Sequence, residues 1–283
     1  MNLQPTMHRA VKQRRTGSKT NKTNNSFQKT DPSVNTNRNR IALVSGGIGG
    51  LGEAICRKLD VAGYQVVTTY SPKNDNAQLW LESQAADGFA FSAYMIDVSD
   101  FGSCEAGVAN IQNEIGRIDV LVNNAGITRD ATLGKMTREN WQRMRQTDLD
   151  SMFNMTKQVI NGMMEQEWGR IVNVSCIDSQ KGAFEKSHFG SANAGIHGFT
   201  KALALEVARK NITVNTVSPG YLSTSRMLRI PPKILRDKIL REIPVGRLGE
   251  PAEVASLIAY LASDDAAFVS GTDIAINGGQ HMH

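Results

Sequence analysis

The chain has 283 residues, 40% of them hydrophobic, which is enough to bury a substantial core and is a common length for one α/β domain. The three cysteines are widely spaced and form no C-x-x-C pair, which argues against a disulfide framework. The histidines form one close pair, at the C-terminus, so no metal site is predicted. The formal net charge of +5 is concentrated at one end, because residues 1–40 hold nine Lys or Arg residues against one Asp.

Residues 1–40 are rich in Asn, Thr and Ser and poor in periodic apolar residues. Such a segment cannot bury enough surface to offset its ordering entropy, so a disordered basic tail is predicted. Its charge would allow weak, salt-dependent contact with nucleic acid or an anionic membrane. An extension without a selected function is the preferred alternative and a transit peptide is a lesser one, while the apolar stretch of a secretory signal is missing.

From Ile41 onward, short β-branched or apolar runs alternate with longer amphipathic segments. The predicted strands are residues 41–45, 65–70, 89–96, 118–123, 170–175, 212–218 and 272–277. The predicted helices are residues 50–62, 75–86, 100–115, 137–166, 187–209 and 250–263. Parallel strands need crossover connections, so this order predicts a single α/β domain over residues 41–283, with a doubly wound, Rossmann-like parallel sheet and helices on both faces. The longest mainly apolar run, residues 254–262, is about half the length of a membrane span, and none is predicted.

A glycine-rich stretch, SGGIGGLGEAI at residues 45–55, lies between the first predicted strand and the first predicted helix. Glycines allow a sharp turn and close approach to a pyrophosphate, whose charge is favoured at a helix N-terminus. Two registers are open, Gly47-x-Gly49-x-x-Gly52 and Gly46-x-x-x-Gly50-x-Gly52, and either is informative only because it follows a strand. After the second strand no acidic residue stands where a ribose 2′-hydroxyl would bind, while Lys73 and, more distantly, Arg57 could meet a 2′-phosphate. NADP(H) is therefore preferred to NAD as the cofactor.

Several longer motifs carry a specific resemblance: NNAGITRD (123–130), WGRIVNVS (168–175), HGFTKALALEVA (197–208), VNTVSPGY (214–221) and NGGQHM (277–282). With them, residues 41–283 resemble the short-chain dehydrogenase/reductases, and among these the NADPH-dependent acetoacetyl-CoA reductases. The resemblance implies the second glycine register, with Ser45 at the position of a Thr. The cofactor-binding residues that it implies are Gly46, Gly50, Leu51, Gly52, Asp97, Val98, Asn123, Ala125, Gly126, Asn193, Pro219 and Gly220.

The same resemblance implies four catalytic positions, and this chain differs at all of them. Phe189 occupies the position of the family's proton-donating Tyr, and Asn193 occupies the position of its Lys. Cys176 occupies the position of the family's Ser, and Asp148 that of its Asn. Phe189 keeps the ring but has no proton to give, and Asn193 cannot stabilise a phenolate although it can still donate to a ribose hydroxyl. No intact catalytic residue remains, so we predict a dinucleotide-binding homologue that is inactive or severely impaired and serves as a regulatory or structural subunit.

The alternative is an active NADPH-dependent 3-oxoacyl-CoA (acetoacetyl-CoA) reductase with an unrecognised proton donor. His188, Tyr221 and Cys176 are the substitutes to consider, although a pocket wall for Tyr221 and an inert thiol for Cys176 are the simpler roles. Along the implied substrate strip, Ala183, Glu185 and Lys186 replace the Gln, Gly and Gln of the resembled enzymes. The resemblance further implies a homotetramer through residues 137–166, 187–209 and the C-terminal segment, or co-assembly with an active paralogue, in the cytoplasm.

Overall fold

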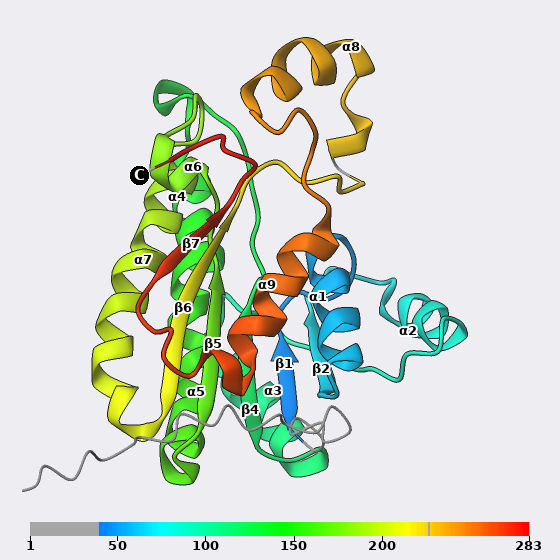
Figure 1. The fold of residues 1–283 in the computed structure, drawn as a ribbon, viewed down its shortest axis with the longest axis vertical. Helices are drawn as coiled ribbons and strands as arrows, with labels where there is room; N and C mark the ends of the chain where they lie inside the picture. The colour runs from blue at the N-terminus through cyan, green and yellow to red at the C-terminus, as the bar shows by residue number, and fades with distance from the viewer. Residues whose placement is uncertain (1–39, 226, 283) are drawn as a thin grey trace, which may run out of the picture. The chain divides into compact units, whose positions relative to one another are not determined.

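Seven parallel strands form one sheet in the order β3-β2-β1-β4-β5-β6-β7 (Figure 1). The computed structural model describes residues 40–225 and 227–282, so the predicted tail lies outside the described residues except for Arg40. The strands are β1 (Ile41–Val44), β2 (Gln65–Tyr70), β3 (Ser92–Met95), β4 (Ile118–Asn123), β5 (Gly169–Val174), β6 (Ile212–Pro219) and β7 (Asp273–Ile276). The predicted doubly wound α/β fold is confirmed.

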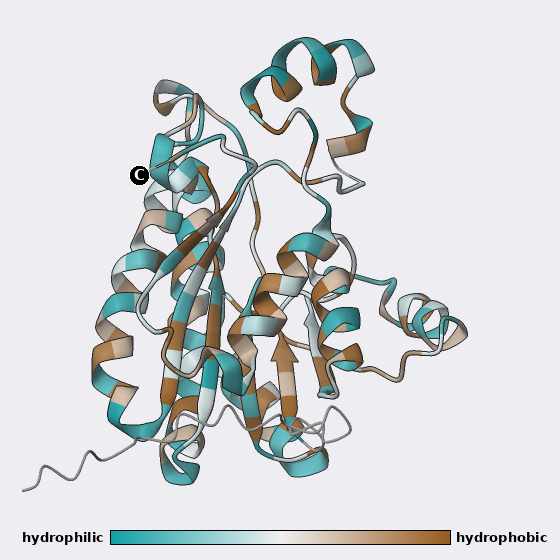
Figure 2. Ribbon diagram, in the orientation of Figure 1, coloured by the Kyte–Doolittle hydropathy of each residue, from teal (hydrophilic) through white to brown (hydrophobic). Residues whose placement is uncertain are grey.

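Helices cover both faces of this sheet. They are α1 (Gly50–Val61), α2 (Ala77–Ala86), α3 (Phe101–Glu114), α4 (Arg138–Arg145), α5 (Ser151–Gln166), α6 (Asp178–Lys181), α7 (Ser187–Val207), α8 (Pro232–Ile234) and α9 (Pro251–Ala262). Successive strand residues point to opposite faces, so Leu43 packs in the core with α3, α5 and α7, while Val44 packs with α1 and α9. The strands are accordingly hydrophobic on both sides, as the brown of β1 shows in Figure 2.

Most predicted elements agree with the structure to within two residues at each end, and three larger differences remain. The strand predicted at 89–96 pairs only over β3, and ahead of it the rings of Phe89 and Phe91 stack on each other with centroids 5.5 Å apart. The helix predicted at 137–166 consists of α4, a π-helical turn at Gln146–Asp150 and α5. Residues 227–242, here called the α8 segment, were not predicted as helical but form η4 (Met227–Arg229), α8, a π-helical turn (Leu235–Ile239) and η6 (Leu240–Glu242).

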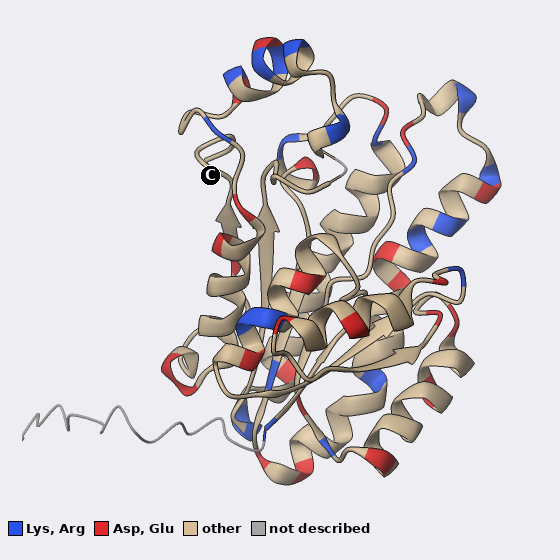
Figure 3. Ribbon diagram, turned by 90° about the vertical axis from the view of Figure 1, so that its right-hand side faces the viewer, with Lys and Arg blue, Asp and Glu red and all other residues tan. Residues whose placement is uncertain are grey.

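The strand order reverses between β1 and β4, where the crossover connections leave to opposite sides. In sheets of this kind the crevice at the carboxyl ends of the strands on either side of that point binds ligands. The same edge faces the α8 segment, at the top of Figure 1. In Figure 3 this segment shows more blue than red, and it carries five basic and two acidic residues: Arg229, Lys233, Arg236, Lys238 and Arg241 against Asp237 and Glu242.

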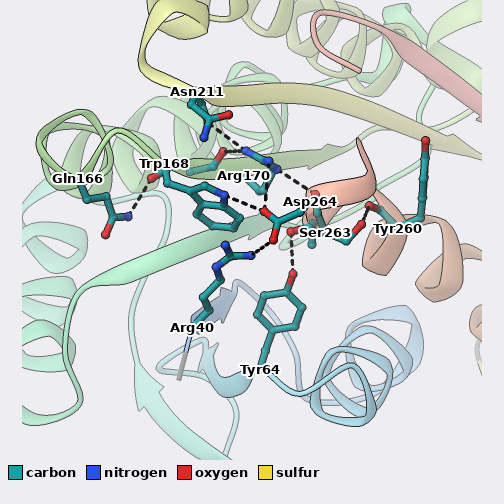
Figure 4. A network of polar contacts seen from close by, with 11 residues as sticks. Arg40, Tyr64, Gln166, Trp168, Arg170, Asn211, Tyr260, Ser263 and Asp264 are labelled. Atoms are coloured by element: carbon teal, nitrogen blue, oxygen red, sulfur yellow. Dashed lines mark hydrogen bonds and ion pairs between the residues drawn. The ribbon is translucent and has the colours of Figure 1, made fainter. Parts of the chain in front are cut away.

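At the opposite, amino-terminal edge of the sheet, a polar network fixes the start of the domain (Figure 4). The Arg170 side chain is fully buried in β5 and donates to the carbonyl oxygens of Ser263 (3.1 Å) and Asn211 (3.0 Å). Arg40 Nη1 pairs with Asp264 Oδ2 at 3.0 Å, and its guanidinium lies 3.8 Å from the centroid of the Trp168 ring. The chain is thereby held directly before β1.

Candidate functional site

The loop between β1 and α1 has the backbone that the glycine pattern predicts. Its φ angle is 66° at Gly46, 90° at Gly49 and 58° at Gly50, a region that residues with a side chain rarely adopt. At Gly52 a Cβ atom would lie 2.2 Å from the carbonyl oxygen of Gly46, so only glycine allows α1 to begin this close to the loop. The free N–H groups at the start of α1 can therefore approach a pyrophosphate.

Side chains link this loop to the end of β4. Ser45 Oγ accepts hydrogen bonds from the N–H groups of Asn124 (3.0 Å) and Ala125 (3.1 Å). In return, Asn124 Nδ2 donates to the carbonyl oxygens of Ser45 and Gly46, each at 3.1 Å. The two loops at the reversal of strand order thus form one preorganised wall.

A cavity of about 400 Å³, here called the glycine-loop cavity, lies against this wall. Seven of the predicted cofactor residues line it: Gly46, Leu51, Gly52, Asp97, Val98, Ala125 and Gly126. Gly50 begins α1 on the exposed side of the loop, and the buried Asn123 amide donates to Thr156 Oγ1 and Asn173 Oδ1 below the cavity. The structure therefore places Asn124, not Asn123, in the lining.

Basic side chains line the part of this cavity that follows β2. Lys73 lies there as predicted, and the lining contains no acidic residue between β2 and α2. Arg57 is directed elsewhere, because its Nη2 pairs with Asp87 at 2.7 Å and with Glu53 at 3.3 Å. Arg143 of α4 lines the cavity instead, which the sequence pattern did not indicate because the residue lies far along the chain from the glycine loop.

Three of the four implied catalytic positions surround a second cavity of about 260 Å³, the Phe189–Asn193 cavity. Asp148, Phe189 and Asn193 line it together with Leu51, Gly126 and Ser175. The Asn193 side chain is buried and its Nδ2 donates to the carbonyl oxygen of Phe189 at 3.0 Å, one turn earlier in α7. The amide thus uses one of its two donors within its own helix, and the adjacent ring has none.

Asp148 is the third of the implied catalytic positions in this lining and lies on the π-helical turn between α4 and α5. Its Oδ1 accepts from the N–H of Ile127 at 2.8 Å, and the residue is 3% exposed. Burial raises the pKa of this carboxyl to about 7, against the opposing effect of the Ile127 hydrogen bond. The Asp148 side chain therefore changes its charge near neutral pH, beside residues that were predicted to hold a cofactor.

Cys176, the fourth position, lies in a third cavity of about 520 Å³, here called the Lys186 cavity, which shares Phe189 with the second. Pro219 and Gly220, predicted to lie near a nicotinamide, line this third cavity as well. Burial and, to a smaller extent, the charge of Asp178 raise the pKa of the Cys176 thiol to about 12. The group is thus a neutral thiol at physiological pH, although Lys186 lies in the same cavity.

The Lys186 cavity contains an ion pair that the sequence pattern did not reveal. Lys186 Nζ donates to Asp178 Oδ2 at 2.7 Å, and the two side chains are 22% and 4% exposed. Burial lowers the pKa of Lys186, but the hydrogen bond and charge of Asp178 outweigh it and the pKa is raised. The ammonium also lies 5.5 Å from the centroid of the Phe189 ring. A cation therefore lies near that ring, in the lining of the Lys186 cavity and not of the Phe189–Asn193 cavity.

The other substitutes occupy different environments. His188 is buried, and its Nε2 lies 2.6 Å from the carbonyl oxygen of Arg129, outside the linings of the three cavities. Tyr221 lines the Lys186 cavity, and burial raises the pKa of its hydroxyl. A raised pKa makes a phenol a weaker acid at neutral pH.

A polar network behind the site holds α6, which carries Asp178. His197 Nδ1 pairs with Asp273 Oδ2 at 2.8 Å, and its Nε2 lies within 3.1 Å of Ser175 Oγ and 3.0 Å of Ser179 Oγ. Gln180 Nε2 of α6 also donates to Asp273 Oδ2, at 2.6 Å. These contacts tie α6 to β7 and so fix the position of the ion pair.

Across residues 40–225 and 227–282, His, Cys, Asp and Glu side chains form no cluster suited to a metal ion. Within the same residues, every helix is too short or too polar to cross a bilayer.

The chain is similar in sequence to several known reductases. A family model described as "Enoyl-(Acyl carrier protein) reductase" matches residues 46–281. The chain is 49% identical over 243 residues to the acetoacetyl-CoA reductase of Cupriavidus necator, covering 86% of this chain and 98% of that protein. It is 47% identical over 241 residues to the acetoacetyl-CoA reductase of Shinella zoogloeoides, with 85% and 98% covered. It is 38% identical over 243 residues to a 3-oxoacyl-(acyl-carrier-protein) reductase of Pseudomonas aeruginosa, with 86% and 98% covered.

Proposed function

Because the chain belongs to the short-chain dehydrogenase/reductase family, we propose that it binds NADP(H) and an acyl-CoA ligand but has lost, or nearly lost, reductase chemistry of its own. The observation that carries this proposal is the pair Phe189 and Asn193, which line the same cavity. We infer that this phenyl ring and amide stand where the family motif has a phenol and an ammonium. When bound, the reduced nicotinamide supplies a hydride to a carbonyl carbon. The chain must then deliver a proton to the carbonyl oxygen, and neither Phe189 nor Asn193 can do so.

The glycine-loop cavity supports the cofactor part of the proposal. Gly46 and Gly52 form a cradle that an added Cβ atom would fill, and the N–H groups at the start of α1 suit a pyrophosphate. Lys73 lies where a 2′-phosphate would bind, and the lining after β2 lacks an acidic residue. These features favour NADP(H) over NAD.

The acyl-CoA part rests on the similarity to acetoacetyl-CoA reductases and on charge near the Lys186 cavity. Met227, Ile230 and Ile239 of the α8 segment line that cavity, and the remainder of the segment carries a basic excess. A basic surface beside an apolar opening suits a ligand with phosphate groups at one end and an acyl chain at the other.

We expect NADPH to bind with a Kd within about tenfold of that of an active relative, because most cofactor contacts would come from backbone groups of the glycine loop and the one missing lysine contact costs about 1.5 kcal/mol, which is about tenfold. Turnover of acetoacetyl-CoA by the same preparation should be lower by about 10²–10⁴, the usual contribution of a general acid. NADPH titration by fluorescence, followed by a turnover assay, measures both. Absence of binding at millimolar NADPH and NADH would remove the cofactor proposal.

An active 3-oxoacyl-CoA reductase with a different proton donor is the second candidate. The observation in its favour is the Lys186 ammonium, which lies 5.5 Å from the Phe189 ring on the side of the Lys186 cavity. Its raised pKa weakens it as an acid. Turnover near the enzyme median of about 10 s⁻¹ would favour this second candidate.

We also propose a homotetramer, or co-assembly with an active paralogue, in the cytoplasm. A groove of about 510 Å³ between α5 and α7 is lined by Phe153, Ile160 and Leu203, and Phe153 is 52% exposed. Exposed aromatic surface next to such a groove suits a subunit interface. The free cysteines agree with a reducing compartment.

Light scattering should therefore give the mass of four chains, and Phe153→Asp should shift it toward smaller species. Leu79→Asp is the matched control, since Leu79 is 65% exposed on α2, away from the groove. A monomeric parent protein would contradict both forms of assembly.

A further inference from the structure

The Lys186–Asp178 pair lies where a substrate-side ligand would reach the Phe189 ring. Lys186, Asp178, Phe189 and Tyr221 all line the Lys186 cavity. An ammonium has three donors, so Lys186 can hold Asp178 Oδ2 at 2.7 Å and a ligand oxygen at the same time. The carboxylate fixes the direction of the ammonium, because Asp178 is itself 4% exposed and held on α6.

The charges in the cavity select the kind of oxygen that fits. Asp178 neutralises Lys186, and Asp130 lines the same cavity and adds a second negative charge near the ammonium. A ligand carboxylate placed there would be repelled by two carboxylates. This repulsion would exceed its attraction to the single ammonium, which Asp178 already shares. A neutral carbonyl oxygen needs only a donor and meets no such repulsion.

We propose that Lys186 is a specificity-determining binding residue whose Nζ donates to a carbonyl oxygen of the acyl group of an acyl thioester, and that the cavity rejects the corresponding free acid. The thioester class rests on the proposed function, whereas the preference for a neutral carbonyl rests on the ion pair. The family motif would supply an ammonium at position 193, in the Phe189–Asn193 cavity. In this chain Lys186 supplies an ammonium in the Lys186 cavity instead, and Phe189 lines both cavities.

The test compares three probes, acetoacetyl-CoA, free CoA and acetoacetate, by calorimetry in the presence of saturating NADP⁺, so that no reduction occurs. The parent protein should show no binding of acetoacetate, and binding of acetoacetate that Lys186→Met abolishes would contradict rejection of the free acid. Lys186→Met should weaken acetoacetyl-CoA binding by about tenfold, as expected for one hydrogen bond from a charged donor, and change CoA binding by less than about twofold. Equal losses for acetoacetyl-CoA and CoA, or no loss for either, would overturn the proposal. NADPH affinity, measured separately, should stay unchanged, so a failure of cofactor binding is distinguished from a failure at Lys186.

Lys181→Met is the matched control, since Lys181 is 23% exposed and pairs with Glu242 outside the cavity lining. It removes the same charge from a nearby position and should leave both affinities within about twofold. Lys186→Met leaves a buried carboxylate unpaired and could destabilise the protein. The double variant Lys186→Met with Asp178→Asn avoids this cost and should show the same selective loss for acetoacetyl-CoA.

Discussion

The combined variant with Asp148→Asn, Cys176→Ser, Phe189→Tyr and Asn193→Lys should reduce acetoacetyl-CoA with NADPH at least about 10³-fold faster than the parent protein. Three of these positions already line one cavity, and the fourth lies across the Phe189 ring from it. The backbone that would present the restored groups is therefore in place. An initial-rate assay with NADPH absorbance measures the gain.

The single substitutions should restore little, because the four groups act as one unit. Phe189→Tyr alone leaves a phenol with a pKa near 10 and no neighbouring cation at position 193 to lower it. Asn193→Lys alone has no phenol to act on, and its new ammonium would share a cavity with the Asp148 carboxyl. An ion pair between those two groups would keep the lysine from lowering the pKa of a restored phenol at position 189. Asp148→Asn is therefore included in the combined variant.

Replacing Asn193→Lys by Asn193→Met in the combined variant provides the control. It fills the same space without a charge and should return activity to within about tenfold of the parent. If the fully combined variant gains no more than this control, loss of the four groups is not the reason for weak activity.

Asp148→Asn alone should stabilise the protein at pH 8 by as much as about 4 kcal/mol and by almost nothing at pH 4. Burial raises the pKa of this carboxyl from 3.8 to about 7, so the folded protein keeps a proton that the unfolded chain releases across that interval. Stability of the parent therefore falls as pH rises from about 4 to about 7 and stays lower above it. Asparagine keeps an oxygen for the Ile127 N–H and has no charge to bury.

Urea unfolding at pH 4, 6 and 8 follows this difference. Asp150→Asn is the matched control on the same turn, where Asp150 pairs with Arg145 at 3.1 Å and is 33% exposed. That surface pair is worth about 0–1 kcal/mol, so the control should change stability little across the range. A pH-independent gain for Asp148→Asn would show that the carboxyl titrates normally in the folded protein.

The sheet and the glycine-loop cavity were predictable because their signals are local. β-branched runs mark the strands, and the glycines at 46 and 52 follow β1 directly, where a turn and a close approach demand them. The α8 segment was missed because its helical turns are short and of mixed type, and two consecutive prolines, Pro231 and Pro232, follow the first of them.

The Lys186–Asp178 pair could not be predicted, since two opposite charges eight residues apart have no fixed relation in sequence. Positive φ angles of 73° at Gly182 and 64° at Glu185 occur in the connection between α6 and α7, and Lys186 contacts Asp178 across it. Arg57 shows the converse, because a basic residue near β2 in sequence is held by Asp87 and faces away from the cavity. In both cases, a partner side chain that is not adjacent in sequence determines where the basic side chain lies.

The contacts of Arg40 with Asp264 and Trp168 have a practical consequence for attaching labels and supports to this protein. They fix the point where the chain enters β1 at the amino-terminal edge of the sheet (Figure 4), whereas the cavities are lined by residues that follow the carboxyl ends of the strands. At the other terminus, Gln280 Oε1 accepts from the N–H of Tyr221 at 3.0 Å, and Tyr221 lines the Lys186 cavity. A purification handle, fluorophore or resin linker is therefore best joined upstream of Arg40, since the same group at the C-terminus would lie close to the Lys186 cavity.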